Sequence, residues 1–110
     1  MRRLLFGDFG AVLRAGFEDV LRNEEVEVLG SEGHDLLEAL VDALPDVVVL
    51  DLDRSGTDEL IDRVVSEFPA VKVIVCSARL PFMRVYPPFH HGEWYEIDLD
   101  PRAFTTVVQA

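Results

Sequence analysis

Apolar residues in this chain follow two spacings: short apolar-rich runs, and sets that recur every three or four positions. The short runs lie at residues 3–6, 25–29, 47–50, 71–76 and 94–97. Runs of this length that are rich in β-branched residues and bounded by Pro, Gly or Ser are typical of strands. The run at 47–50 contains no polar position, which predicts a central strand buried on both faces. It ends in carboxylates, at Asp51 and Asp53.

Four further segments carry apolar residues at helical spacing, near residues 11–21, 36–44, 57–68 and 103–108. Pro45 and Pro69 each end one of these segments, and Asp100 followed by Pro101 predicts an N-cap with proline in the first helical position. Strands that alternate with helices form parallel βαβ units with right-handed crossovers. The sequence therefore predicts an α/β fold with a single domain over residues 1–110.

Five strands in a chain of this length fit a flavodoxin-like parallel sheet of order 2-1-3-4-5, with helices on both faces. The first and third strands are neighbours in that order. Asp8 and Asp51 would then lie side by side at the carboxyl edge of the sheet, where open α/β sheets bind their ligands.

Residues 79–92 interrupt the alternation, because they occupy the place of a fourth helix but contain Pro81, Pro87 and Pro88. Each proline removes a backbone donor and restricts the residue before it. We expect at most one helical turn, near residues 82–86, so that the fourth helix is shortened or replaced by a proline-rich loop. The aromatic residues of this segment either fold back over the sheet or form a docking surface.

Composition and charge exclude several classes of function. The 110 residues contain 21 acidic and 10 basic side chains, for a formal net charge of -11. Direct nucleic-acid binding and attachment to anionic membranes both need a basic surface, so neither is expected. The single cysteine, Cys76, rules out an internal disulfide and suits a reducing compartment. Because the sequence shows no signal peptide and no membrane span, we expect a cytoplasmic protein.

Four pieces of the chain resemble the receiver domain of two-component response regulators, and the resemblance spans essentially the whole sequence. The pieces are residues 4–8 (Leu-Leu-Phe-Gly-Asp), residues 45–52 (Pro-Asp-Val-Val-Val-Leu-Asp-Leu), Gly56, and residues 73–78 (Val-Ile-Val-Cys-Ser-Ala). The second piece is fairly specific. The others are weak alone but fall in the right order at the right spacing.

The resemblance implies that Asp51 is a phosphoryl acceptor, a carboxylate nucleophile that forms an aspartyl phosphate. It implies a Mg²⁺ ion held by Asp8, Asp51 and the backbone carbonyl of Asp53, since Mg²⁺ prefers oxygen ligands. Ser77 would contact the phosphoryl group through its hydroxyl, and Trp94 would lie near the aromatic switch position on the last strand.

The same resemblance implies a histidine kinase or another signalling protein as partner, and a homodimer. Its docking face would include Phe82, Tyr86 and Phe89. The expected protein is a signalling domain rather than an enzyme.

The chain departs from the receiver pattern at three places. Gly7 stands where the first of two adjacent acids is usual, and Arg54-Ser55 replaces a Met-Pro pair. The lysine expected at the end of the last strand is absent, because residues 94–98 contain no base and Lys72, the only lysine, begins the fourth run. Arginine differs from lysine in geometry and hydration, so Arg54 and Arg79 are poor substitutes.

Two hypotheses of different class follow. One is a receiver in which phosphorylation of Asp51 controls protein association. The other is a phosphorylation-independent pseudo-receiver that acts as a dimerisation or partner-docking module, which the missing lysine favours. A small-molecule site at the same edge rests on fold analogy alone, and the spacing of Cys76, His90 and His91 matches no structural zinc site.

Overall fold

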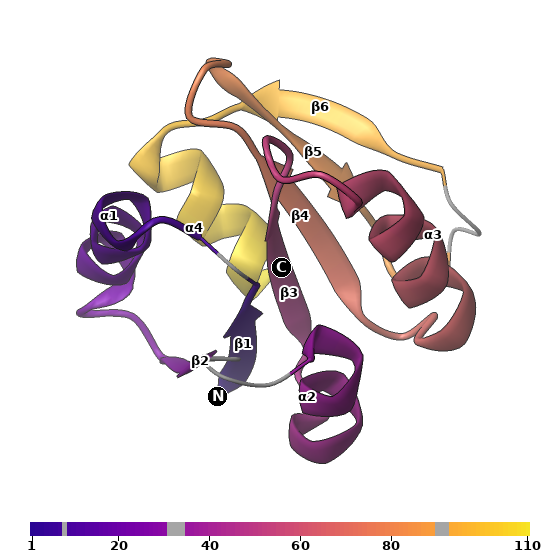
Figure 1. Ribbon diagram of the computed structural model, residues 1–110. Helices are drawn as coiled ribbons and strands as arrows, with labels where there is room; N and C mark the ends of the chain where they lie inside the picture. The colour runs from indigo at the N-terminus through magenta and orange to yellow at the C-terminus, as the bar shows by residue number, and fades with distance from the viewer. Residues whose placement is uncertain (8, 31–34, 90–92) are drawn as a thin grey trace.

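The computed structural model describes residues 1–7, 9–30, 35–89 and 93–110. The helices are α1 (Ala11–Leu21), α2 (Leu36–Ala43), α3 (Thr57–Glu67) and α4 (Pro101–Gln109). The strands are β1 (Arg2–Phe6), β2 (Val26–Gly30), β3 (Val47–Asp51), β4 (Lys72–Cys76), β5 (Phe82–Tyr86) and β6 (Tyr95–Asp98). All six strands belong to one sheet, in the order β2-β1-β3-β4-β5-β6 (Figure 1).

The first four strands form the parallel part of the sheet. β1 pairs with both β2 and β3, and β3 pairs with β4, so that Leu5 lies beside Val48 and Val49 beside Ile74. These strands are rich in valine, leucine and isoleucine because both faces of the sheet are covered. The predicted α/β class and a mostly parallel central sheet are therefore confirmed.

Helices cover both faces of the sheet, as the sequence predicted. On one face α1 and α4 pack against β1, β3 and β4 around a ring cluster of Phe6, Phe9, Phe17 and Phe104. On the other face Leu40 of α2 and the α3 side chains of Ile61 and Val64 pack over the sheet. Each helix lays one apolar stripe on the sheet, which is what its three-and-four spacing predicted.

The prediction of at most one helical turn near residues 82–86 was wrong. Residues Phe82–Tyr86 form the strand β5, antiparallel to β4, instead of a helical turn or a proline-rich loop. The sheet consequently has six strands, and β5, which runs against the other five, breaks the all-parallel five-strand arrangement. The reason is that this segment has the period of two typical of a strand: Met83 and Val85 are fully buried and alternate with Phe82, Arg84 and Tyr86. The prolines lie outside the strand, so they cost it no ladder hydrogen bond.

β6 pairs antiparallel with β5, so it runs in the same direction as β4, and it leads into α4. The predicted start of that helix is confirmed, because the Asp100 side chain accepts a hydrogen bond from the Ala103 N–H at 2.9 Å and Pro101 takes the first helical position. At the other end of α4, Lys72 of β4 donates from Nζ to the backbone oxygens of Val107 (2.7 Å) and Ala110 (3.1 Å). None of the described helices is long and apolar enough to cross a membrane.

Candidate functional site

The carboxyl ends of β3 and β4 bring two loops together at one edge of the sheet. Asp51, the last residue of β3, lies in register with Cys76, the last residue of β4. The pairing continues one step further, because Leu52 N–H donates to the Cys76 carbonyl at 2.8 Å. Residues 52–56 and 77–81 therefore leave the sheet side by side, and their polar side chains face each other.

The Asp51 side chain is mostly buried and contacts its own loop. It is 13 % exposed. One carboxylate oxygen, Oδ1, accepts a hydrogen bond from the Asp53 N–H at 2.9 Å, a local turn in which an Asp side chain bonds the backbone two residues on. The other oxygen, Oδ2, lies 3.9 Å from Nε of Arg54, whose half-exposed side chain makes this contact weak in water.

Thr57 holds the base of the same loop. Its buried hydroxyl lies 2.8 Å from the Asp51 carbonyl oxygen and 2.9 Å from that of Arg54, so it can donate to either. Gly56, the residue before it, has a φ of +82°. That left-handed conformation favours glycine, and it turns the chain sharply from β3 into α3.

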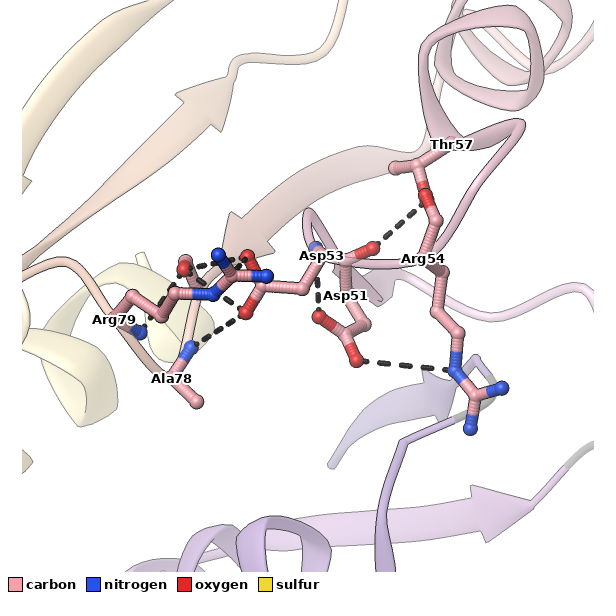
Figure 2. Close-up of polar contacts among 7 residues, drawn as sticks. Asp51, Asp53, Arg54, Thr57, Ala78 and Arg79 are labelled. Atoms are coloured by element: carbon pink, nitrogen blue, oxygen red, sulfur yellow. Dashed lines mark hydrogen bonds and ion pairs between the residues drawn. The ribbon is translucent and has the colours of Figure 1, made fainter.

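The carboxylate of Asp53 points across to β4 instead of toward Asp51 (Figure 2). It accepts the hydroxyl of Ser77, with Oδ1 at 2.8 Å and Oδ2 at 3.0 Å. Its Oδ2 also accepts from the Ala78 N–H at 3.1 Å. The Arg79 guanidinium approaches Oδ1 to 4.0 Å, and the Arg79 N–H donates to the Ser77 hydroxyl oxygen at 3.1 Å. Asp53 thus ties the β3–α3 loop to the β4–β5 loop, and we call this set of contacts the Asp53 bridge.

The Asp53 bridge occupies the only proton that the Ser77 hydroxyl can donate. A hydroxyl has one proton to donate, and that proton goes to Asp53, while the oxygen accepts from Arg79. Ser77 is buried, so a ligand that needed its hydroxyl would first have to displace the Asp53 carboxylate.

The predicted site residues are only partly brought together. Asp51, Asp53 and Ser77 share the carboxyl edge, whereas Asp8 lies outside the described residues. Trp94 precedes β6 next to Tyr95, which pairs with Val85 of β5, and Tyr86 pairs with Val73 near the amino end of β4. Trp94 therefore lies toward the opposite end of the strands from Asp51.

The described residues offer little to a cation. Among residues 1–7, 9–30, 35–89 and 93–110 no three His, Cys, Asp or Glu side chains form a group that could hold a metal ion. Asp51 already accepts from the backbone and faces Arg54, and the Asp53 carboxylate is turned to β4. A Mg²⁺ ion therefore does not fit these groups as they lie, and its binding stays a prediction that depends on Asp8.

Lys72 lies at the amino end of β4 and is engaged with the end of α4, so it is remote from this edge. The cations beside Asp51 and Asp53 are those of Arg54 and Arg79, and both are exposed. Burial, together with the nearby Asp51 charge, raises the pKa of the Cys76 thiol to about 12. This thiol is therefore a packing group and not a nucleophile at neutral pH.

Gly7 has a structural reason to lack a side chain. Its N–H donates to the Val49 carbonyl at 2.8 Å. A Cβ placed on it would lie 3.0 Å from Cδ2 of Leu50 and 3.3 Å from that carbonyl oxygen. β1 and β3 approach too closely here for an acidic side chain unless Leu50 moves.

The three residues predicted for a docking face differ in accessibility. Tyr86 is buried and Phe82 is partly buried, but Phe89 is 66 % exposed. Phe89 has a φ of +62°, unusual for a bulky residue, and its N–H donates to the Pro69 carbonyl at 2.8 Å. Trp94 is 46 % exposed and packs under the Arg84 guanidinium, 4.3 Å from its ring centre.

Sequence reasoning missed the roles of Thr57, Arg79 and the Asp53 side chain. A threonine directly after Ser-Gly at the start of a helix is a detectable signal for a hydroxyl that bonds the preceding turn. The Asp53 bridge had no local signal, because its two halves are separated by 24 residues in the chain. No model of a known protein family matches this chain, and no curated protein matches it either.

Proposed function

We propose that this chain is a receiver-like interaction domain whose partner binding does not depend on phosphorylation of Asp51. The observation that carries the proposal is the Asp53 bridge. A carboxylate of the chain itself accepts from the Ser77 hydroxyl, the group that the receiver resemblance assigns to a phosphoryl group on Asp51, and from the neighbouring Ala78 N–H. The Asp53 side chain thus already places an acidic group at this position.

The charges around the edge support the same proposal. A phosphoryl group adds about two negative charges at neutral pH. Here it would approach Asp53 as well as Asp51, with two exposed arginines and no lysine at this edge of the described structure. Exposed cations compensate buried negative charge poorly because water screens them.

The test is intact-mass measurement after incubation with Mg²⁺ and acetyl phosphate. Wild type, Asp51→Asn and Asp53→Ala are compared, all checked for folding by circular dichroism. We expect no phosphoryl adduct on wild type, since the Ser77 side of the edge is occupied. An adduct on wild type that is absent from Asp51→Asn would overturn the proposal.

A second candidate is phosphoryl transfer to Asp51, favoured by the position of this carboxylate at the end of the central strand. In that reaction an Asp51 carboxylate oxygen would attack the phosphorus of the donor, and the donor's leaving oxygen would depart with the electron pair of the broken bond. The same measurement decides between the two. An adduct that forms only on Asp53→Ala would show that Asp53 blocks a chemically competent Asp51.

The predicted homodimer is tested through the exposed aromatic side chains. Phe89→Ser and Trp94→Ser remove accessible ring surface and leave the buried Tyr86 in place. If these rings form a self-association surface, sedimentation velocity will show a dimer for wild type and a monomer for the variants. A wild-type monomer at high concentration would remove dimerisation from the proposal and leave partner docking.

A further inference from the structure

β6 lies at one of the two edges of the sheet, and β2 lies at the other. β6 pairs with β5 on one side, and no described strand pairs with its other side (Figure 1). An edge strand presents a row of unpaired N–H and C=O groups that another strand can pair with. Partner proteins use such edges by adding an extended segment as one more strand.

The register identifies which backbone groups face outward. The Leu99 N–H donates to the Pro81 carbonyl at 2.9 Å, so Leu99, Ile97 and Tyr95 point their backbone groups toward β5. In an antiparallel pair the residues between them point theirs the other way. The unpaired N–H and C=O groups at the edge therefore belong to Glu96 and Asp98.

The same two residues carry acidic side chains on a single face of the strand. Glu96 lies opposite Arg84 and Asp98 opposite Phe82, whereas Ile97 lies opposite the buried Met83 on the other face. The strand thus alternates acidic and apolar positions. Glu93 and Asp100 extend the acidic character on both sides, and residues 93–100 contain no base.

No cation of the described chain neutralises these acids. Among the described residues neither Glu96 nor Asp98 takes part in an ion pair. Arg84, the cation directly opposite Glu96, is used elsewhere: its guanidinium covers the Trp94 ring at 4.3 Å and its NH1 donates to the Tyr86 hydroxyl at 3.2 Å.

We propose that the open edge of β6 pairs with an extended segment of a partner protein that carries lysine or arginine at every second position and apolar residues between them. Its basic side chains would lie opposite Glu96 and Asp98, and its apolar ones beside Tyr95 and Ile97. Oppositely charged pairs directly across two strands are stabilising. The exposed Trp94 ring lies at the end of this row, where it can cover a further cation.

A second copy of this chain is the wrong occupant. Pairing two β6 strands would set Glu96 and Asp98 of one copy against the same acids of the other, and like charges directly opposite each other are destabilising. Acids on an edge strand discourage self-pairing and at the same time select a basic partner strand. The inference rests on the function proposed above, since it names the partner surface of a domain that binds without phosphorylation.

The test is a titration with a fluorescent, end-capped nine-residue peptide that alternates lysine with valine, followed by fluorescence anisotropy. Two control peptides have the same composition: one groups all the lysines at one end, and one keeps the alternation but is N-methylated at every second residue. We expect a dissociation constant below about 100 µM for the alternating peptide, and at least about tenfold weaker binding of both controls. Equal binding of all three peptides would overturn the proposal, because it would show charge attraction without strand pairing.

Protein variants locate the binding to β6. The double variant E96K/D98K should weaken binding at least about tenfold more than E38K/D62K, which makes the same change in net charge on exposed positions of α2 and α3. Glu96→Pro should bind more weakly than Glu96→Gln. Both lose the same charge, but only the proline removes the outward N–H. Equal binding by the two double variants would overturn the proposal. If Glu96→Pro fails to fold, the N-methylated peptide takes its place as the test, and strong binding of that peptide would overturn the proposal.

All titrations are run without Mg²⁺ and without a phosphoryl donor. A phosphoryl adduct on Asp51 in the separate intact-mass experiment would refute phosphorylation independence and leave the strand-pairing result untouched. Failure of wild type to bind the alternating peptide would refute strand pairing and leave the adduct experiment unaffected.

Discussion

Replacing Asp53 with alanine should measure how firmly the Asp53 bridge holds the two loops together. Alanine removes the acceptor for the buried Ser77 hydroxyl and for the Ala78 N–H. Hydrogen bonds to a charged group contribute about 1.5–3 kcal/mol each, and a buried donor left without a partner costs about 1–3 kcal/mol. The Asp53 side chain is 27 % exposed, so water recovers part of this loss. We expect the free energy of unfolding to fall by about 2 kcal/mol.

The converse replacement should cost less. Ser77→Ala leaves the Asp53 carboxylate with the Ala78 N–H and with water, so we expect a loss of about 1 kcal/mol. In the Asp53→Ala background the Ser77 hydroxyl has lost the acceptor of its proton and keeps only the hydrogen bond from the Arg79 N–H, so the same change should cost almost nothing. The double-mutant cycle should therefore give a coupling energy of about 1 kcal/mol between the two side chains.

The assay is urea denaturation at pH 7 followed by circular dichroism, with Asp62→Ala as the matched control. Asp62 is an exposed acid in the middle of α3, and its loss should change stability by less than about 0.5 kcal/mol. The reasoning would be refuted if Asp53→Ala behaved like Asp62→Ala. It would also be refuted if the effects of Asp53→Ala and Ser77→Ala simply added.

Three further predictions concern other parts of the fold. The folded Cys76 thiol should resist iodoacetamide at pH 8. Because its pKa rises from 9.0 to about 12 on folding, the stability that it contributes below pH 9 should be lost between pH 9 and 12. A Cys76→Ala variant with the same alkaline loss of stability would contradict this prediction. Gly7→Asp should destabilise the protein by about 1–3 kcal/mol, because its side chain would press on Leu50. Gly16→Ala in α1, where a Cβ meets nothing within 4 Å, should stabilise it by about 0.5–1 kcal/mol. Thermal melting that gave both changes the same sign would refute the packing argument. Asp100→Ala removes the cap of α4 and should cost about 1 kcal/mol in urea denaturation, while an unchanged midpoint would show that the cap is not used.

The parallel part of the sheet could be predicted from the sequence because its signal is local. The run at Val47–Asp51 is apolar at four successive positions, and the helices on either side of it repeat every three or four residues. β5 carried an equally local signal, the alternation of Met83 and Val85 with polar or aromatic neighbours. It was missed because Pro81 and Pro87 indicated a broken helix, whereas in the structure they mark the two ends of a strand.

The candidate site could be predicted only in part. Asp51 and Ser77 follow from strand ends, and both lie at the expected edge. The direction of the Asp53 side chain depends on where β4 places Ser77 and Ala78, which no pattern near Asp53 encodes. Trp94 was expected near the site on the last strand, but it comes directly before the first residue of β6, which runs in the same direction as β4, so it lies at the opposite end of the sheet from Asp51. The pairing of Asp8 with Asp51 stays a prediction.

The engagement of Lys72 with the end of α4 has a consequence for the chemistry of the whole surface. Lys72 is the only lysine among the 110 residues, and it is buried. Its Nζ donates hydrogen bonds to two backbone oxygens. Burial, and to a smaller extent the charge of Arg2, lower the pKa of Lys72. Acylation, methylation or ubiquitin attachment at a side-chain amine would require the contact between β4 and α4 to open first. Cross-linking reagents would find no exposed lysine side chain in this chain, and reagents that activate carboxylates are better suited to its acidic surface.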